Sequence, residues 1–389
     1  MTFRIRTLNA ISPVGLSRLP GDRYQVSHDV SDPDALLVRS AKLHGEPIPA
    51  SVLAVARAGA GTNNIPVDEL SKRGIPVFNT PGANANAVKE LVVAGIFLAA
   101  RNIVDAAAFA HRLEGDHATM DKLVEAGKKA YVGFELPGRT LGVIGLGAIG
   151  VEVANVAVSL GMRVLGYDPA ITVEHAWALS SSVEHVTSLE QMLKRSDIIT
   201  VHVPLVDGTR GLIGAEQFKA MKKSAVLLNF ARGAIVDETA LIAALENNQL
   251  RGYVCDFPTP LLNKRPHVVT LPHLGASTKE AEDNCAVMAA DELKAYLEDG
   301  TIRNSVNFPN AQLPRAEGRR RLAIANANVP NMVGQISTMV GEAGLNIADL
   351  VNSSRGELAY TLVDVDGDVP AALVDRIRAV PGVLHARVL

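Results

Sequence analysis

Three glycines with the spacing Gly-x-Gly-x-x-Gly stand between a short apolar run and a helical pattern. They are Gly145, Gly147 and Gly150; the run Thr140–Ile144 precedes them and the helical pattern continues to about residue 160. The first glycine permits a tight turn, the second lets a pyrophosphate approach, and the third lets the helix pack close to a sheet. A helix N-terminus also attracts phosphate. The pattern predicts a dinucleotide site, and the alternative is a structural glycine turn.

Asp168 directly follows the next apolar run, Arg163–Tyr167. A carboxylate roughly 20 residues beyond such a glycine turn can accept hydrogen bonds from both ribose hydroxyls of NAD. It would repel the 2′-phosphate of NADP, and Pro169 rather than an arginine follows it. The sequence therefore predicts NAD as the cofactor.

Composition excludes several classes of protein. The chain has 389 residues, 48% of them hydrophobic, and its 38 basic and 41 acidic residues give a net charge of -3. Such a balance gives no net positive electrostatic field that would attract nucleic acid or an anionic membrane. Cys255 and Cys285 stand apart from any Cys/His cluster, which argues against a disulfide framework and a metal site and favours a reducing, cytoplasmic location. The most apolar run, residues 91–100, is too short to span a bilayer.

Strand and helix patterns alternate along most of the chain, which predicts an α/β fold with parallel sheets. In the first part the expected strands are 35–39, 53–56 and 76–78, and an apolar helix is expected over 87–102. Six further strands, which fit a doubly wound sheet, are expected at 140–144, 163–167, 198–201, 225–229, 252–255 and 268–270. The final segment reads strand, helix, strand, strand, helix, strand, the ferredoxin-like βαββαβ plan.

Four stretches carry a resemblance to a known family. They are the glycine turn with Asp168; residues 201–204 (VHVP) with Thr209; residues 229–238 (NFARGAIVDE); and residues 271–278 (LPHLGAST), continuing to Asn284. Over nearly its whole length the chain resembles the NAD-dependent D-2-hydroxyacid dehydrogenases, in particular the phosphoglycerate dehydrogenases with a C-terminal ACT domain. The resemblance implies a Rossmann-type doubly wound cofactor domain inserted in a flavodoxin-like substrate domain.

The same resemblance implies the domain boundaries. A substrate-binding domain would occupy residues 1–87 and be completed by 274–306, and the NAD-binding domain would occupy 88–273. Residues 307–318 would form a linker to an ACT domain at 319–389. The active site would lie in the cleft between the first two domains.

Oxidation of a 2-hydroxy acid requires a hydride acceptor, a base for the hydroxyl proton and a cation for the carboxylate. Arg232 follows a predicted strand at the end where α/β sheets place ligands, and its guanidinium can grip a carboxylate with two parallel hydrogen bonds. His273 follows the strand 268–270, and histidine titrates near neutral pH. The alternatives are a surface arginine and a structural histidine. The resemblance assigns both residues to catalysis.

One departure from the family concerns the partner of His273. The family supplies a glutamate that hydrogen-bonds this histidine, but here residues 255–260 read CDFPTP and no glutamate lies between Glu246 and Glu280. Asp256 is the one carboxylate in that stretch. It resembles the family's aspartate beside the nicotinamide; the alternative is that it reaches His273 as a stand-in for the missing glutamate, so the partner of His273 stays open.

The resemblance implies further contacts. Ala148 and Ile149 would offer backbone N–H groups to the pyrophosphate. The other cofactor contacts would be His202, Pro204, Thr209, Phe230, Ala231, Arg232, Asp256, His273 and Gly275. Substrate contacts would come from Arg39, Ser40 and Asn84.

The C-terminal module resembles ACT domains, which pair across subunits and bind amino acids at the interface. Asn328 and Asn346 occupy positions that bind serine in the family, so L-serine is an expected effector; the alternative is a dimerisation module without an effector. A homodimer or homotetramer is expected.

The resemblance implies NAD-dependent oxidation of 3-phospho-D-glycerate to 3-phosphohydroxypyruvate, the first step of L-serine biosynthesis. Two alternatives are a D-2-hydroxyacid dehydrogenase with another substrate and a non-catalytic NAD-sensing regulator.

Overall fold

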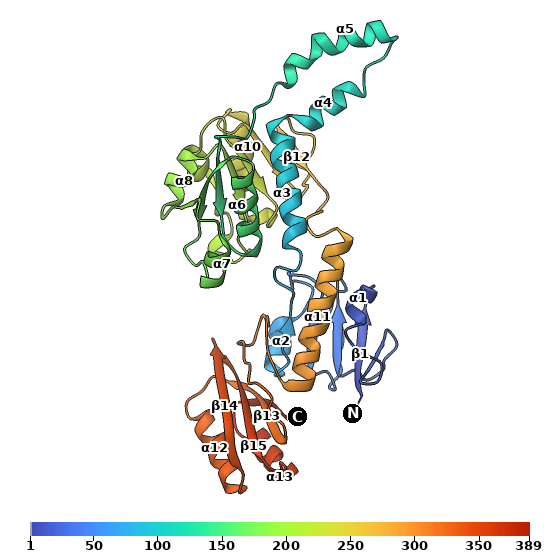
Figure 1. Cartoon of the computed structure of the whole chain (residues 1–389), viewed down its shortest axis with the longest axis vertical. Coiled ribbons are helices and arrows are strands. Elements are labelled where there is room, and N and C mark those ends of the chain that lie inside the picture. The colour runs from blue at the N-terminus through green and yellow to red at the C-terminus, as the bar shows by residue number, and fades with distance from the viewer. Residues whose placement is uncertain (1) are drawn as a thin grey trace. The chain divides into compact units, whose positions relative to one another are not determined.

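A computed structural model describes residues 2–389 and divides them into two compact units. The first unit comprises the chain up to Asn84 together with Lys279–Leu389, and the second unit is Ala85–Thr278 (Figure 1). The chain thus crosses between the units twice, as an inserted domain requires. These crossings lie within a few residues of the predicted boundaries at 87/88 and 273/274.

The first unit contains a five-stranded parallel sheet with the order β2-β1-β3-β4-β5, which is the flavodoxin-like order. Ala35–Val38 is buried at every position because helices cover both faces of a parallel sheet. The long helix α11 (Lys279–Asp299) packs on this sheet through Ala289, Leu293 and Tyr296. The other elements are β1 (Phe3–Leu8), β2 (Tyr24–Ser27), β3 (Ala35–Val38), β4 (Ala54–Arg57), β5 (Val77–Phe78), α1 (Pro13–Leu16) and α2 (Val67–Lys72).

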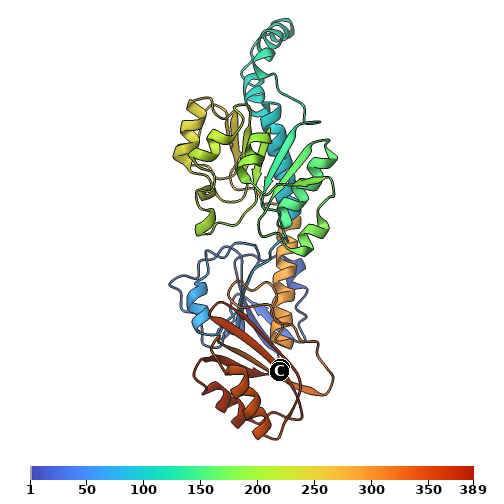
Figure 2. The same cartoon turned by 90° about the vertical axis from the view of Figure 1, so that its left-hand side faces the viewer.

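The second unit contains a seven-stranded parallel sheet with the order β12-β11-β10-β9-β6-β7-β8, which confirms the doubly wound Rossmann-type prediction. Helices cover both of its faces (Figure 2). The strands are β6 (Thr140–Ile144), β7 (Arg163–Tyr167), β8 (Val183–His185), β9 (Ile198–Val201), β10 (Val226–Asn229), β11 (Gly252–Cys255) and β12 (Val268–Thr270).

The helices of the second unit include an arm, α4 and α5, that extends away from the sheet in both views (Figures 1 and 2). The α-helices are α3 (Ala85–Ala100), α4 (Ile103–Ala110), α5 (His117–Gly127), α6 (Ala148–Ser159), α7 (Val173–Ala178), α8 (Leu189–Arg195), α9 (Ala215–Ala220) and α10 (Glu238–Glu246). Short 3-10 turns occur at η1 (Lys128–Tyr131), η2 (Asp207–Thr209) and η3 (Gly233–Ile235). Within residues 2–389 no single helix has the length and apolarity of a membrane span. Together α3 and α4 have that length and apolarity, but a bend of 65° separates them.

The C-terminal part has the βαββαβ order with an antiparallel sheet β14-β15-β13-β16, the ferredoxin-like plan that was predicted. Its elements are β13 (Arg319–Ala327), α12 (Met332–Glu342), β14 (Asn346–Arg355), β15 (Leu358–Asp366), α13 (Ala371–Arg378) and β16 (Val383–Val388). One face of the sheet carries α12 and α13 over Leu322 and Ile324, and the other packs Ala323 and Ala325 into the core that contains α11.

Buried side chains tie this sheet to the C-terminal end of α11. Arg387 donates hydrogen bonds to the carbonyls of Tyr296 and Leu297, and the hydroxyl of Tyr360 donates to the carbonyl of Gly300 at 2.9 Å. Arg321, fully buried, pairs with Asp364 and also donates to the carbonyl of Asp299. Because helix-end carbonyls need partners, these contacts join the ferredoxin-like part to the first unit.

The segment 307–318 is irregular, as expected of a linker, but its start is not a free tether. Phe308 is fully buried in the core of the first unit. The side chain of Asn307 accepts a hydrogen bond from Val77 N and donates to Ile75 O. Apolar burial and backbone pairing therefore hold this part of the chain in place.

Candidate active site

The glycine turn joins β6 to α6 in the predicted place. Gly145 has φ +89°, a left-handed conformation that favours glycine. A Cβ at Gly150 would lie 1.9 Å from the Gly145 carbonyl oxygen, so this glycine lets the helix close over the turn itself. A Cβ at Gly147 would meet no atom within 4 Å. The second position thus opens onto free space beside the N-terminus of α6.

Two predicted phosphate contacts and the ribose contact surround that space. Ala148 and Ile149 form the first turn of α6, whose N-cap, Gly147, provides no side-chain hydrogen bond. Asp168 follows β7, and its carboxylate accepts hydrogen bonds from Leu146 N and Ala170 N, both at 2.8 Å. These bonds fix the carboxylate at the carboxyl edge of the sheet and leave lone pairs for further donors.

The loop after β9 carries the next predicted cofactor residues. The ring nitrogen Nε2 of His202 lies 2.9 Å from the hydroxyl of Thr200, and burial lowers the pKa of His202 to about 3. The imidazole is therefore neutral at neutral pH. The hydroxyl of Thr209 donates to the carbonyl of Pro204 and accepts from Val206 N, which closes the loop into a rigid turn.

Arg232 lies at the carboxyl end of β10 in a loop that an asparagine fixes. The fully buried Asn229 donates from Nδ2 to the carbonyl of Arg232 at 2.9 Å, and its Oδ1 accepts from Ala231 N at 3.1 Å. The guanidinium is exposed, with one bond to the Ala231 carbonyl. Asn229 begins the motif 229–238, but no role was predicted for its side chain. Its place three residues before the arginine, at the end of a buried strand, is the pattern that could have revealed it.

Phe230 and Ala231 were expected to line the nicotinamide side. The ring of Phe230 is only 5% exposed and packs against Gly95 of α3 in the core of the second unit. Any contact from Phe230 must therefore come from its main chain, whereas Ala231 is partly exposed.

His273 lies in the loop after β12, in a left-handed conformation with φ +51°. Its main-chain N–H donates to the carbonyls of Asp256 at 3.0 Å and Leu271 at 3.1 Å. The imidazole is exposed, and its ring centroid lies 5.1 Å from that of Phe257. Within residues 2–389 no side chain hydrogen-bonds to this imidazole, so the structure shows no glutamate equivalent.

Asp256 lies at the end of β11, the strand between those that carry Arg232 and His273. The residue is 1% exposed; its Oδ2 accepts from Gly275 N at 3.2 Å, while Oδ1 has no hydrogen-bond partner among residues 2–389. Burial raises the pKa of Asp256, and the Gly275 N–H and the charges of His273 and Arg232 act in the opposite direction. One carboxylate thus lies within electrostatic reach of both proposed catalytic residues.

The arrangement fits NAD on two observations. The open space at Gly147 beside an uncapped helix N-terminus suits a pyrophosphate. The buried, unpartnered Oδ1 of Asp256 is an acceptor that lacks a donor, and a carboxamide N–H would satisfy it.

The three predicted substrate residues belong to the first unit. Arg39 follows β3, and its guanidinium forms an ion pair with Glu282 of α11. The main-chain N–H of Ser40 donates to the side chain of Asn9 at 3.1 Å. Asn84 immediately precedes α3, and its side chain is partly exposed. Glu282 was not singled out from the sequence, because nothing local distinguishes it from other carboxylates of its helix.

The two predicted effector residues lie at opposite ends of the ferredoxin-like sheet. Asn328 follows β13 and donates to the carbonyl of Gly356 at 3.0 Å, whereas Asn346 begins β14 and donates to Asp366 at 2.9 Å. A site that uses both must therefore draw on two copies of the chain.

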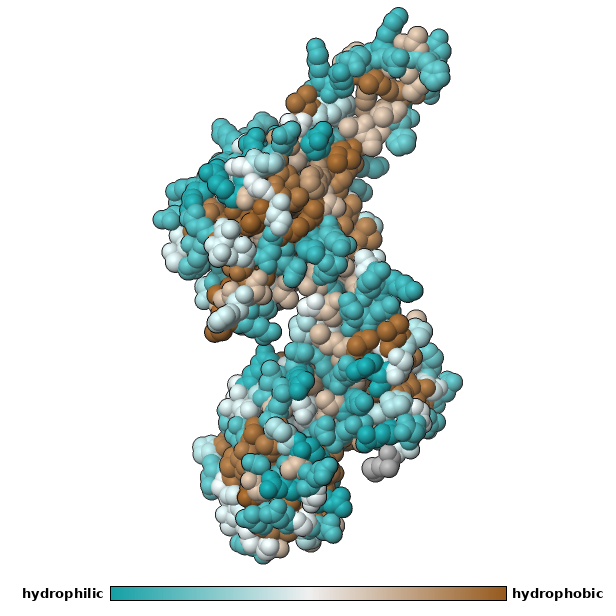
Figure 3. All heavy atoms as spheres, viewed as in Figure 1, coloured by the Kyte–Doolittle hydropathy of each residue, from teal (hydrophilic) through white to brown (hydrophobic). Residues whose placement is uncertain are grey.

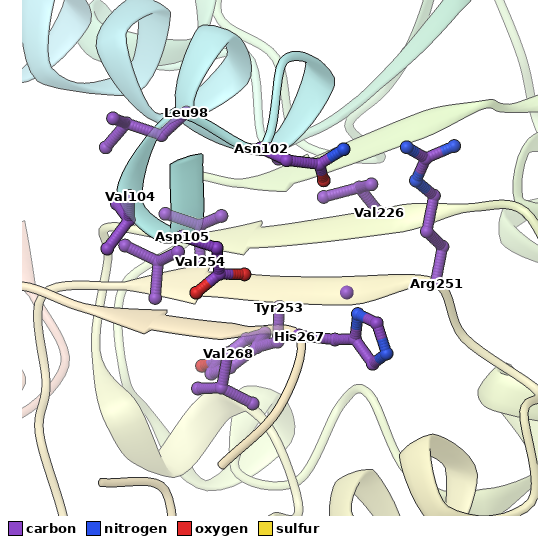
Figure 4. Close-up of a pocket in the computed structure, with 13 residues that line it drawn as sticks. Leu98, Asn102, Val104, Asp105, Val226, Arg251, Tyr253, Val254, His267 and Val268 are labelled. Carbon is purple, nitrogen blue, oxygen red and sulfur yellow. The ribbon is translucent and has the colours of Figure 1, made fainter. Parts of the chain in front are cut away.

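Two other features lie outside this site. A small pocket of about 50 Å³ lies at the amino ends of β10, β11 and β12, at the edge opposite to Arg232 and His273, and Arg251, Asp105 and His267 contribute to it (Figure 4). In the part of the chain that the structure describes, no group of three or more His, Cys, Asp or Glu side chains could hold a metal ion.

Comparisons with known proteins agree with this geometry. Residues 96–275 match the family model for the D-isomer specific 2-hydroxyacid dehydrogenase, NAD binding domain. A D-3-phosphoglycerate dehydrogenase of Escherichia coli K12 is 36% identical over 342 residues, which cover 85% of this chain and 79% of that protein. A protein of the same name from Methanocaldococcus jannaschii is 37% identical over 358 residues, 88% of this chain and 64% of the relative.

Solved structures show the same likeness. The NAD+-bound 3-phosphoglycerate dehydrogenase of Entamoeba histolytica has a TM-score of 0.62 and 26% identity, over 79% of this chain and 99% of that one. The D-mandelate dehydrogenase of Rhodotorula graminis has a TM-score of 0.68 and 26% identity, over 81% and 100% of the two chains. The chain therefore belongs to the D-isomer specific 2-hydroxyacid dehydrogenases and is an NAD-dependent dehydrogenase.

Proposed function

We propose that this dehydrogenase oxidises 3-phospho-D-glycerate to 3-phosphohydroxypyruvate, the first step of L-serine biosynthesis. The observation that carries the proposal is the shared edge of one sheet on which Arg232, Asp256 and His273 follow three adjacent strands. The names of the relatives supply the substrate class, since the curated relatives from E. coli and M. jannaschii are D-3-phosphoglycerate dehydrogenases.

Each residue has a role that its chemistry allows. When bound, NAD supplies the nicotinamide that accepts the hydride from C2. The exposed guanidinium of Arg232 grips the substrate carboxylate with two parallel hydrogen bonds and so orients C2. The imidazole of His273 takes the proton of the C2 hydroxyl and returns it in the reverse direction. The buried carboxylate of Asp256 lies after the strand between those of Arg232 and His273, and it holds the histidine loop by accepting a hydrogen bond from Gly275 N.

The first unit supplies the remaining proposed contacts. Arg39 and Ser40 follow a buried strand at its carboxyl end, where a polar pair is available to an anion, and Asn84 precedes a helix. Glu282 neutralises Arg39 in this structure, so a substrate phosphate would compete with that carboxylate for the guanidinium.

The test is NADH consumption with 3-phosphohydroxypyruvate, compared with hydroxypyruvate and pyruvate. The proposal predicts a preference of about 100-fold or more in kcat/KM for the phosphorylated substrate, because a charge-assisted phosphate contact stabilises the complex by several kcal/mol. Equal rates would refute the assignment of the substrate. Binding of NADH without turnover of any 2-oxo acid would instead favour the non-catalytic regulator.

We also propose that the chain forms a homodimer or homotetramer. No residue of α4 or α5 is buried, and the helices expose large apolar side chains. Each of these is about 40% exposed: Ile103, Val104, Leu123 and Val124. Figure 3 shows apolar atoms at the surface of this arm. A second copy of the chain would cover them. Sedimentation velocity should show an oligomer that Leu123→Lys weakens; a monomeric wild-type protein would contradict this.

We propose further that the ferredoxin-like part is an ACT domain with L-serine as its effector, bound through Asn328 and Asn346 of two copies. Isothermal titration with L-serine and an activity assay test this; no heat and no inhibition would leave a dimerisation module without an effector.

A cytoplasmic location is proposed from the two buried cysteines that form no disulfide, Cys255 and Cys285. Cell fractionation tests the location, and recovery outside the cytoplasm would contradict it.

A further inference from the structure

In the described part of the chain, no hydrogen bond fixes the orientation of the His273 imidazole. Two bonds anchor the main-chain N–H of His273, but within residues 2–389 none reaches its ring. The second side-chain torsion of histidine is soft, so an unbraced imidazole samples a wide range of directions. An acid–base group must nevertheless point at the reacting hydroxyl, and misplacement by about 1 Å can cost roughly 100-fold in rate. Some other contact must therefore restrict the ring.

Among residues 2–389, Phe257 supplies the one aromatic ring contact to this imidazole. The centroids are 5.1 Å apart and the planes are inclined by 53°, an arrangement within the favoured range of aromatic pairs. Such a contact limits rotation about the side-chain torsions of His273 without occupying a ring nitrogen. Both nitrogens therefore stay available to substrate and solvent.

The position of Phe257 follows from the topology of the sheet. Phe257 comes two residues after the end of β11, and β11 pairs with β10 on one side and β12 on the other. The residue thus lies between the loop of Arg232 and the loop of His273. An ideal Cβ at Gly233, the residue after Arg232, would lie 3.4 Å from the Cβ of Phe257. Phe257 consequently lies close to the loop of Arg232 as well.

The main chain at Phe257 is itself held. The thiol of Cys255 contacts the Phe257 carbonyl at 3.7 Å, and the neighbouring Asp256 accepts from Gly275 N in the histidine loop. The side chain is partly buried against the apolar core on its side of the sheet. These contacts hold the main chain that carries the Phe257 ring in place.

We propose that Phe257 is a positioning residue that braces the His273 imidazole and sets its direction relative to Arg232. In this chain a packing contact does the orienting that a hydrogen-bonded glutamate does in the family pattern. The inference rests on the proposed acid–base role of His273.

The test compares Phe257→Leu, which removes the ring, with Phe257→Tyr, which keeps it. Phe218→Leu is the matched control, because Phe218 is 2% exposed in the same core but belongs to α9, away from the catalytic loops. We measure kcat, KM for 3-phosphohydroxypyruvate, NADH affinity by fluorescence, the isotope effect with 4-deuterated NADH, and the unfolding temperature.

The expected result is a loss in kcat of roughly tenfold or more for Phe257→Leu, with a larger isotope effect. KM and NADH affinity should change by less than about threefold, because binding does not depend on the imidazole direction. Phe257→Tyr should recover most of kcat, and Phe218→Leu should lower the unfolding temperature while leaving kcat near that of the wild type. An unchanged kcat in Phe257→Leu, or equal losses in Phe257→Leu and Phe218→Leu, would overturn the proposal.

A double variant separates this inference from the proposed function. If Phe257 acts through His273, adding Phe257→Leu to His273→Gln should slow turnover no further. If His273→Gln keeps the wild-type rate, the acid–base assignment itself fails. If His273→Gln is inactive and Phe257→Leu is unaffected, only the positioning role fails.

Discussion

The glycine turn allows ligand binding and folding to be separated by two alanine substitutions. Gly147 has φ −75° and ψ −167°, a conformation that any residue adopts, and an added Cβ meets no atom within 4 Å. Gly147→Ala should therefore fold normally and gain about 0.4–1 kcal/mol, since alanine restricts the unfolded chain. The same methyl group would fill the space proposed for the pyrophosphate. We expect NADH affinity to fall at least about tenfold, or ~1.4 kcal/mol.

Gly150→Ala should have the opposite profile in stability. Its Cβ would lie 1.9 Å from the Gly145 carbonyl oxygen, and a hydrogen bond from Gly145 N to Tyr167 O at 2.9 Å holds that turn in place. Overpacking of this kind costs about 1–3 kcal/mol. At roughly 2–4 °C per kcal/mol, the apparent unfolding temperature should fall by several degrees.

The assay combines thermal unfolding without cofactor and titration of NADH by fluorescence for both variants. The two substitutions add the same methyl group three residues apart, so each controls for the other. Equal destabilisation by both would refute the packing argument. Unchanged NADH binding in Gly147→Ala would refute the placement of the pyrophosphate.

Three further predictions concern charge and burial. Asp168→Asn keeps an acceptor for Leu146 N but removes the negative charge. The ratio of kcat/KM with NADH to kcat/KM with NADPH should therefore fall at least about tenfold, and an unchanged ratio would contradict the role of Asp168. Burial raises the pKa of Glu292 to about 8 from 4.5, and its Oε2 has no hydrogen-bond partner in the described part of the chain. The native state therefore keeps a proton that the unfolded state loses between these values, and wild-type stability should fall as pH rises through this window. Glu292→Gln should match the wild type near pH 5 and be more stable near pH 9 in urea unfolding, and a parallel pH dependence would contradict this. Arg387→Met should lower the free energy of unfolding by about 2 kcal/mol, because the Leu297 carbonyl loses a buried donor. The control Arg376→Met breaks an exposed pair with Glu342 and should lower it by less than about 1 kcal/mol. Equal losses in urea unfolding would refute the docking role of Arg387.

The sequence predicted the Rossmann-type sheet well because each of its central strands is a buried apolar run followed by a turn residue. The run 198–201 and the glycine turn after 140–144 are examples. It missed β1, where arginines alternate with apolar residues in FRIRTL, the four-residue β2 (YQVS) and the three-residue β8. In these cases tertiary contacts select the strand, because the local pattern alone is too short or too polar.

Within the candidate site, the sequence predicted the residues to which we assign chemistry but not those that hold their loops. Arg232 and His273 stand out by type and by their place after strands. Asn229 holds its own loop through hydrogen bonds to Ala231 and Arg232. The role proposed for Phe257 depends instead on a contact with the His273 loop, which the neighbouring positions of β11 and β12 in the sheet make possible. The docking of the ferredoxin-like sheet on α11 depends in the same way on the buried side chains of Arg321 and Arg387, which nothing in the local sequence distinguishes from exposed arginines.

The most direct test of the account asks whether Arg232 and His273 act on the same substrate molecule. Hydride transfer from saturating NADH to 3-phosphohydroxypyruvate is measured in single turnovers for Arg232→Gln, His273→Gln and the double variant. Residues that work as one unit show strongly non-additive losses, so the double variant should be no slower than the worse single variant by more than about tenfold. Losses that multiply across the two sites, or a single variant that keeps the wild-type rate, would contradict the account.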